Sequence, residues 1–355
     1  SEINGMRLTG PHIPYKITTP NNMGVVRYIL AFAVLFAHFK TLAGYNFYFP
    51  VSSYEGVGGF FALSGFLIYG SYLRKPGLKS YLTSRAWRIL PAYWVTVIFF
   101  ALLLCIASTL TPGQYFTSSG FWEYLAANIS FLNFLHPALP GVFDSPAFYM
   151  DAVNGSLWTM KIEWCLYITP PIVVWLIRRL KANPMVMFTL IYILACAYRI
   201  TFEYMYEATG SQIYEIMSRQ IFGQLSYFYA GVGCYYSFHA MMRRKWLVLI
   251  VAIVALSLQH FIPYGHIIIH PLALAVLVIW VSMVGRWGTW EGKHDNTSYN
   301  IYLIHFPIIQ LFVHYRGDTP VSLPAALALC LLTTILLAYL LSKAEHQIRH
   351  HLRKQ

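Results

Sequence analysis

The stretch RYILAFAVLFAH (residues 27–38) is an almost wholly apolar run with an arginine at one end and a histidine at the other. Eleven positions separate the two polar residues, and on a helix that turns by about 100° per residue they share one face. They would then lie about 16 Å apart along the axis. If the helix crosses a bilayer whose hydrocarbon core is about 30 Å thick, with Arg27 at one edge, His38 lies near the middle.

The composition predicts an integral membrane protein. Of the 355 residues, 57% are hydrophobic, 17% aromatic and only 11% charged, which lies outside the range of soluble domains. Apolar windows of about 20 residues recur along the chain and predict an all-α fold of ten transmembrane helices. The windows are 24–43, 56–73, 89–110, 156–178, 185–204, 219–239, 245–262, 266–284, 297–315 and 322–342.

Lysine and arginine gather in every second connecting segment, as expected for the cytoplasmic side of a membrane. Segment 74–88 holds five basic residues, whereas loop 111–153 holds none and carries three acidic ones. This pattern predicts that both termini are cytoplasmic and accounts for most of the net charge of +12. The basic residues do not cluster on a soluble face, so we expect no nucleic-acid partner.

The windows also predict how the chain is organised. Residues 1–23 form a cytoplasmic N-terminal segment, 24–342 a ten-span membrane domain and 343–355 a basic cytoplasmic tail, with no fused soluble domain. Loop 111–153 contains FWEYLAANISFLNFLH, which is apolar but too short to span, and we expect an interfacial or re-entrant helix there. The five cysteines lie singly without CxxC spacing, so neither a disulfide framework nor a metal site is expected.

Three ionisable residues at membrane depth are candidates for a functional site, because charged groups there are costly. They are His38, Glu163 and His305. Glu163 and its neighbour Lys161 are two residues apart and point to different helix faces, so no ion pair between them is expected. Each histidine has an alternative role as a hydrogen-bonded packing residue, and Pro307 frees a carbonyl that His305 could bond.

Five motifs follow one another along the chain, and together they resemble the acyltransferase 3 family of integral membrane O-acyltransferases. They are the R-x10-H spacing of 27–38, FFALSGFLI (60–68), SRAWRILPAYW (84–94), NGSLWTMKIEW (154–164) and SYNIYLIHFP (298–307). The resemblance implies transfer of an acyl group, usually acetyl, from cytoplasmic acyl-CoA to a hydroxyl of a carbohydrate or lipid-linked glycan across the membrane. It also implies the bacterial cytoplasmic (inner) membrane, with envelope polysaccharides such as lipopolysaccharide O-antigen as acceptors.

The residues fit this chemistry. Transfer to a sugar hydroxyl needs a base with a pKa near neutrality, a role that suits histidine and that we assign to His38. Glu163 would hold the His38 ring in the right tautomer, as the third member of a triad does. His305 is the further catalytic candidate. Ser64, Asn154 and Tyr302 are possible donors to the developing oxyanion.

The donor, acetyl-CoA as co-substrate, carries phosphates that favour planar guanidinium groups over lysine. Arg85 and Arg88, at i and i+3, fit such a site, and Arg27 and Ser64 are further donor-binding candidates. An alternative explanation for these arginines is the positive-inside rule, because basic residues gather on the cytoplasmic side of a membrane whether or not they bind a donor.

A different class of function also fits residues of this kind. In a secondary transporter or flippase for a sugar-lipid or small solute, His38 and Glu163 would form a proton relay. Such transporters often show two matching halves, and the sequence shows no internal symmetry. The expected partners are therefore acyl-CoA, a glycan acceptor and membrane lipids.

Overall fold

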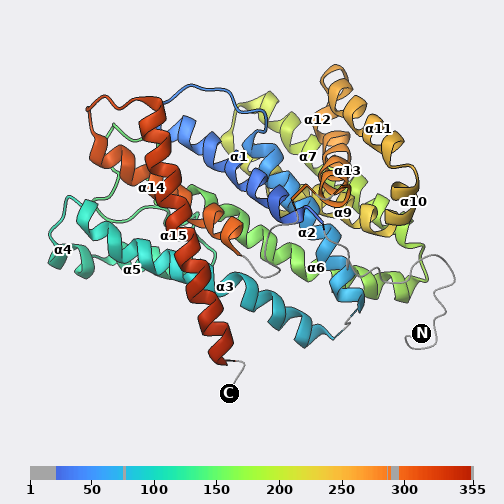
Figure 1. Ribbon diagram of the computed structural model, residues 1–355, viewed down its shortest axis with the longest axis horizontal. Coiled ribbons are helices and arrows are strands. Elements are labelled where there is room, and N and C mark those ends of the chain that lie inside the picture. Colours follow the sequence, from blue (N-terminus) through green and yellow to red (C-terminus); the bar gives the residue numbers. More distant parts are fainter. Residues whose placement is uncertain (1–20, 75–76, 286, 289–295, 353–355) are drawn as a thin grey trace. The chain divides into compact units, whose positions relative to one another are not determined.

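The computed structural model describes residues 21–74, 77–285, 287–288 and 296–352. Within these ranges every regular element is a helix and no strand occurs (Figure 1), which confirms the all-α prediction. The expected cytoplasmic segment 1–23 lies almost wholly outside the described residues.

Six helices of the described chain are long and apolar enough to cross a membrane, as expected of an integral membrane protein. Two of them are extended by a short 3-10 turn, η1 (Leu104–Ala107) after α3 and η2 (Gly155–Leu157) before α6. The six are α1 (Met23–Ala43), α2 (Ser53–Arg74), α3 (Leu78–Leu103), α6 (Trp158–Leu180), α7 (Pro184–Thr209) and α15 (Leu323–Leu352).

Three of the four remaining predicted spans are shorter than the six, and the fourth, α14 (Thr297–Arg316), has 20 residues but is not among the six. Windows 219–239, 245–262 and 266–284 contain main helices of 16, 14 and 14 residues, shorter than the stretch of about 20 that spans a bilayer. The ten-span count is therefore not confirmed, and the cytoplasmic termini stay a prediction. The elements here are α8 (Gln212–Ser218), α9 (Ile221–Tyr236), α10 (Phe238–Arg243), α11 (Lys245–Leu258), η3 (Gln259–Phe261), α12 (Gly265–Ile268), α13 (His270–Met283) and α14 (Thr297–Arg316).

The loop over 111–153 contains two short helices, α4 (Pro112–Thr117) and α5 (Ser119–Ile129), where one was predicted. Ser118 separates them, because its extended backbone ends α4 and its hydroxyl caps the N-terminus of α5. The Tyr93 hydroxyl of α3 donates to the carbonyl of Asn128 at 2.6 Å and fastens the end of α5. Trp122 on α5 is 61% exposed, and the interfacial or re-entrant placement of this segment stays a prediction.

The chain divides into two compact units built from interleaved segments. The first unit comprises the described residues of 1–26, 58–83 and 162–289, and the second those of 27–57, 84–161 and 290–355. The predicted membrane domain 24–342 therefore contains segments of both units.

In the first unit, α2 and α9 meet at glycines. A Cβ on Gly65 of α2 would lie 1.9 Å from the carbonyl oxygen of Phe228, and one on Gly231 of α9 would lie 2.0 Å from that of Ala62. The two backbones are therefore in direct contact, which is how helices associate in lipid through small residues. The motif FFALSGFLI has this packing role in addition to any functional one.

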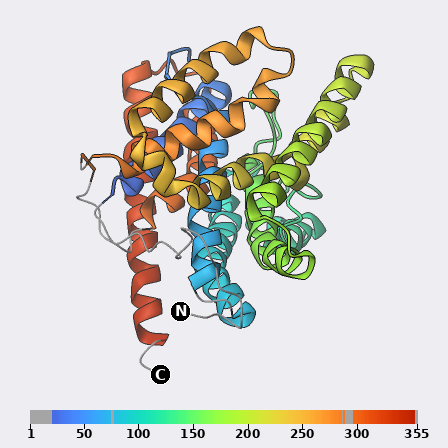
Figure 2. The ribbon, with the colours of Figure 1, turned by 90° about the vertical axis from the view of Figure 1, so that its right-hand side faces the viewer.

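In the second unit, α1, α14 and α15 share a hydrophobic core. Phe39 and Phe306 are both buried in it, next in sequence to the two candidate histidines. Arg316 donates to the carbonyl of Ala43 at 3.1 Å and so satisfies the C-terminal end of α1. Figures 1 and 2 show α14 and α15 lying side by side in this unit.

Two glycines of α9 give a matched test of the helix contact. We expect Gly231→Ala to destabilise the protein by about 1–3 kcal/mol, because the added methyl group overlaps a backbone oxygen that cannot move away cheaply. Gly233→Ala should be neutral or stabilising by up to about 1 kcal/mol, since a Cβ there meets nothing within 4 Å. Thermal unfolding in detergent compares the two. Equal melting temperatures would contradict the close α2–α9 contact.

Candidate functional site

The structure brings His38 and His305 together. Nδ1 of His38 on α1 lies 2.8 Å from Nε2 of His305 on α14. Their rings stack with centroids 5.1 Å apart and an angle of 13° between the planes. Both residues belong to the second unit.

Each histidine was a candidate from the sequence, but the contact between the two was not predicted.

The hydrogen bonds assign the tautomer of each ring. Nδ1 of His305 lies 3.1 Å from the carbonyl oxygen of Ile301, and because a carbonyl only accepts, Nδ1 carries the hydrogen. In the neutral ring, Nε2 of His305 is then an acceptor, so Nδ1 of His38 must be the donor in the contact between them. The free lone pair of His38 is therefore on Nε2, where a general base needs it.

The surroundings of the two rings differ. His305 is fully buried, whereas His38 is half-buried. Phe306 packs edge-on against His38 with the ring centroids 5.1 Å apart, and Tyr302 packs edge-on against His305 at 6.0 Å. His38 is thus the more accessible histidine, and His305 contacts it from the buried side.

Pro307 in α14 explains how the neighbouring turn is held. Proline lacks an N–H, so the carbonyl of Leu303, four residues earlier, loses its helical partner. Nδ2 of Asn154 donates to this carbonyl at 2.6 Å. The alternative in which His305 bonds the freed carbonyl is wrong, because His305 bonds Ile301 instead.

The same contact places Ser156 beside the histidines. Oδ1 of Asn154 accepts from the backbone N–H of Ser156 at 3.1 Å, and Oγ of Ser156 lies 3.3 Å from Nε2 of His305. Thr159 and Tyr302 add a hydroxyl–hydroxyl bond of 2.7 Å. The motifs at 154–164 and 298–307 therefore meet around His305.

The contacts of Asn154 and Tyr302 give them a structural role, and their role as oxyanion donors stays a prediction. Asn154 and Tyr302 were considered as oxyanion donors, and the structure shows them holding the 154–157 turn to α14. Sequence reasoning missed Ser156, whose one signal was its place two residues after Asn154 in the fourth motif.

Glu163 belongs to the first unit, whereas His38 belongs to the second. Within α6 the hydroxyl of Tyr167, one turn along, donates to the Glu163 carboxylate. The predicted pairing of Glu163 with His38 stays a prediction. Ser64 also lies in the first unit, half-buried on α2.

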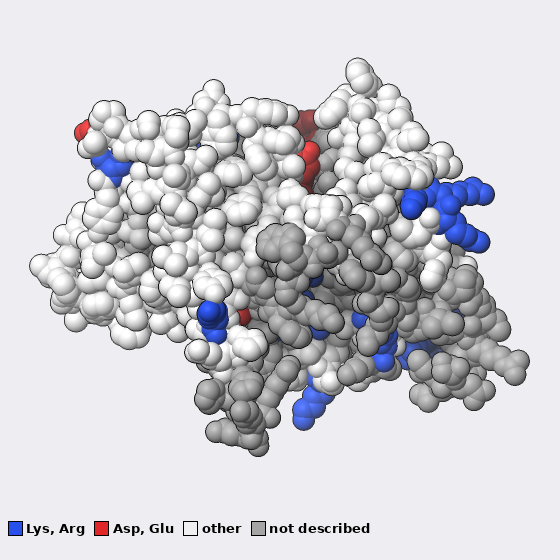
Figure 3. All heavy atoms as spheres, in the orientation of Figure 1, with Lys and Arg blue, Asp and Glu red and all other residues white. Residues whose placement is uncertain are grey.

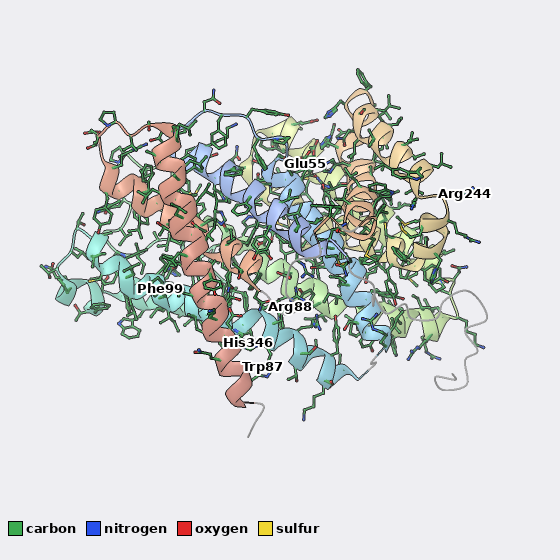
Figure 4. All side chains as sticks on the ribbon, viewed as in Figure 1. Glu55, Trp87, Arg88, Phe99, Arg244 and His346 are labelled. Atoms are coloured by element: carbon green, nitrogen blue, oxygen red, sulfur yellow. The ribbon has the colours of Figure 1, made fainter. Side chains whose placement is uncertain are left out.

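The arginine candidates all lie in the second unit. The sequence predicted a span that begins at residue 89, which would place Arg85 and Arg88 just before the helix. In the structure α3 begins at Leu78, so both arginines lie within it. Both are half-buried, and Figure 4 labels Arg88. Arg27 is half-buried on α1. Their role in binding a donor stays a prediction.

Asn154 and Pro307 should be coupled energetically. Asn154→Ala leaves the Leu303 carbonyl without a donor, and we expect it to cost about 1–3 kcal/mol of stability. In a Pro307→Ala background the helix supplies its own N–H to that carbonyl, so the cost should fall by about 1 kcal/mol. A double-mutant cycle of unfolding free energies measures this coupling.

The control for this cycle is Asn183→Ala, which removes the N-cap of α7 and should cost the same in both backgrounds. An Asn154→Ala cost that does not depend on residue 307 would contradict the assignment.

Comparison with known proteins identifies similar chains. A family model described as "Acyltransferase domain" matches residues 21–343. The chain is 24% identical over 334 residues to a protein named O-acetyl transferase from Shigella phage Sf6, covering 88% of this chain and 92% of that one. It is 28% identical over 183 residues to nodulation protein 10 of Rhizobium leguminosarum bv. viciae, covering 48% of this chain and 49% of that one. No solved structure matches.

Proposed function

Because the chain belongs to the acyltransferase 3 family of membrane proteins, we propose that it moves an acyl group, acetyl in the simplest case, from acyl-CoA to a hydroxyl. The acceptor in this proposal is a cell-envelope carbohydrate outside the bacterial inner membrane. The contact between His38 and His305 carries the proposal, and the name of the phage relative, O-acetyl transferase, supports it.

In the proposed reaction His38 is the general base. Its Nε2 takes the proton of the acceptor hydroxyl while that oxygen attacks the thioester carbonyl. The carbon–sulfur bond then breaks, and the imidazolium returns the proton to the departing thiolate. The products are the ester and free CoA, so one histidine handles the proton in both directions.

His305 is the positioning residue for His38. Its Nε2 accepts the Nδ1 hydrogen of His38, which fixes the tautomer and stabilises the imidazolium, as the third member of a triad does. The Ile301 carbonyl fixes His305 in turn. A neutral imidazole can therefore fill the role first given to Glu163.

The donor is proposed to bind from the cytoplasm. Arg85 and Arg88 are one helical turn apart on α3, so their guanidinium groups can engage phosphates of CoA together. Arg27, near the cytoplasmic end of α1, would add a third cation. A base placed near the bilayer middle would let the thioester and the acceptor hydroxyl approach from opposite sides.

The histidine pair makes a direct prediction about rate. His38→Ala should lower kcat for acetyl transfer at least about 100-fold, because general-base catalysis is worth about 10²–10⁴-fold. His305→Gln should lower kcat less, with little change in KM, because a glutamine oxygen can still accept from Nδ1 of His38. His314→Gln, on the same helix, is the matched control and should retain activity.

The assay is transfer or hydrolysis of acetyl-CoA by purified protein. A His38→Ala variant that keeps more than about a tenth of the rate contradicts the role of His38. A wild-type protein that binds a glycan lipid but never consumes acetyl-CoA would favour transport.

The arginine pair makes a prediction about the donor. Arg85→Lys and Arg88→Lys keep the charge but lose the bidentate geometry, so KM for acetyl-CoA should rise about tenfold. Arg74→Lys, at the end of α2, is the control and should leave KM unchanged. An unchanged KM for acetyl-CoA in both α3 variants would contradict a role in donor binding and leave only the positive-inside rule to explain these arginines.

A further inference from the structure

A groove lies within the first unit between α7, α9 and α13. It encloses about 300 Å³ and is lined mostly by apolar and aromatic side chains, among them Phe188, Tyr229 and Leu272. Gly233 forms part of its wall, and a Cβ there would meet nothing within 4 Å. The missing side chain of this glycine therefore keeps the groove open.

Two groups of basic residues, called here the basic turns, lie at one end of the groove: 178–181 at the end of α6 and 243–245 at the start of α11. Met185, which lines the groove, closely follows the basic end of α6, and Met241, which also lines it, closely precedes the start of α11. The six exposed basic residues are Arg178, Arg179, Lys181, Arg243, Arg244 and Lys245. Figure 3 shows lysine and arginine gathered at the α10–α11 turn, where Figure 4 labels Arg244.

These cations have no acidic neighbours in their own segments. Residues 164–202 and 216–288 contain no aspartate or glutamate, and none of the six side chains is in an ion pair within the described chain. The positive-inside rule explains why basic residues lie on this side. It does not explain an open apolar groove beside them.

We propose that this groove and its two basic turns bind one anionic phospholipid of the cytoplasmic leaflet. One acyl chain lies in the groove, along the roughly 10 Å of α7 from Met185 to Tyr192, and the headgroup phosphate meets the basic side chains. Trp246 and Trp280 mark the depth of the headgroups, because interfacial tryptophans sit at that level. Their ring centroids are 5.4 Å apart, and Nε1 of Trp280 donates to the carbonyl of Lys245 at 2.8 Å.

The charges and the groove are tested separately. The full chain is purified from membranes containing phosphatidylglycerol and phosphatidylcholine with the same acyl chains, and retained lipid is counted by native mass spectrometry. Wild type should retain about one phosphatidylglycerol and little phosphatidylcholine. The triple variant R243Q/R244Q/K245Q should retain about tenfold less phosphatidylglycerol. R74Q/K79Q/K343Q, with three other basic residues removed, should behave as wild type.

The groove is tested by filling it. Gly233→Leu should lower retention of phosphatidylglycerol several-fold, whereas Gly113→Leu, which adds the same side chain to open space on α4, should not. If Gly233→Leu fails to fold, the exposed glutamine variants decide the question. Equal retention of both lipids by wild type, or unchanged retention in R243Q/R244Q/K245Q, would overturn the proposal.

Displacement of the lipid by a long-chain acyl-CoA would also overturn it, because the groove would then belong to the donor. None of these measurements uses acyl transfer. Failure of the lipid site and failure of the proposed enzyme are therefore distinguishable.

Discussion

A backbone carbonyl inside a membrane needs a hydrogen-bond donor from the protein, because no water is there to supply one. Where proline interrupts a helix, the carbonyl four residues earlier loses its helical N–H, and the structure depends on the side chain that replaces it. The carbonyl four residues before Pro171 accepts a hydrogen bond from the hydroxyl of Tyr81. The carbonyl four residues before Pro307 accepts one from the amide of Asn154. In each case an interruption of one helix becomes a polar attachment point for another segment of the same unit.

The attachment at Pro307 positions the candidate site. By binding the freed carbonyl, Asn154 places Ser156 beside Nε2 of His305. His305 in turn orients His38. A chain of short polar contacts thus leads from a proline, which has no chemical role of its own, to the nitrogen proposed to act as the base.

The two histidines also lie next to the hydrophobic core formed by α1, α14 and α15. Phe39 and Phe306, their neighbours in sequence, are buried in the packing of α1, α14 and α15. Side chains in a close-packed core occupy single rotamers, which restricts the backbone positions from which the two rings extend. The geometry of the pair is therefore set by packing, as the proposed proton transfer would require.

The sequence by itself determined the helical membrane class and the spacing of Arg27 and His38, because composition and helical periodicity are local properties. Only the tertiary structure decided that His38 meets His305, 267 positions away, and that Asn154 takes the carbonyl freed by Pro307. It also divided predicted spans, because hydropathy averaged over a window does not register a helix break such as Ser237 between α9 and α10 or Ile269 between α12 and α13. Contacts of this kind depend on which helices pack together, and no local pattern in the chain encodes that.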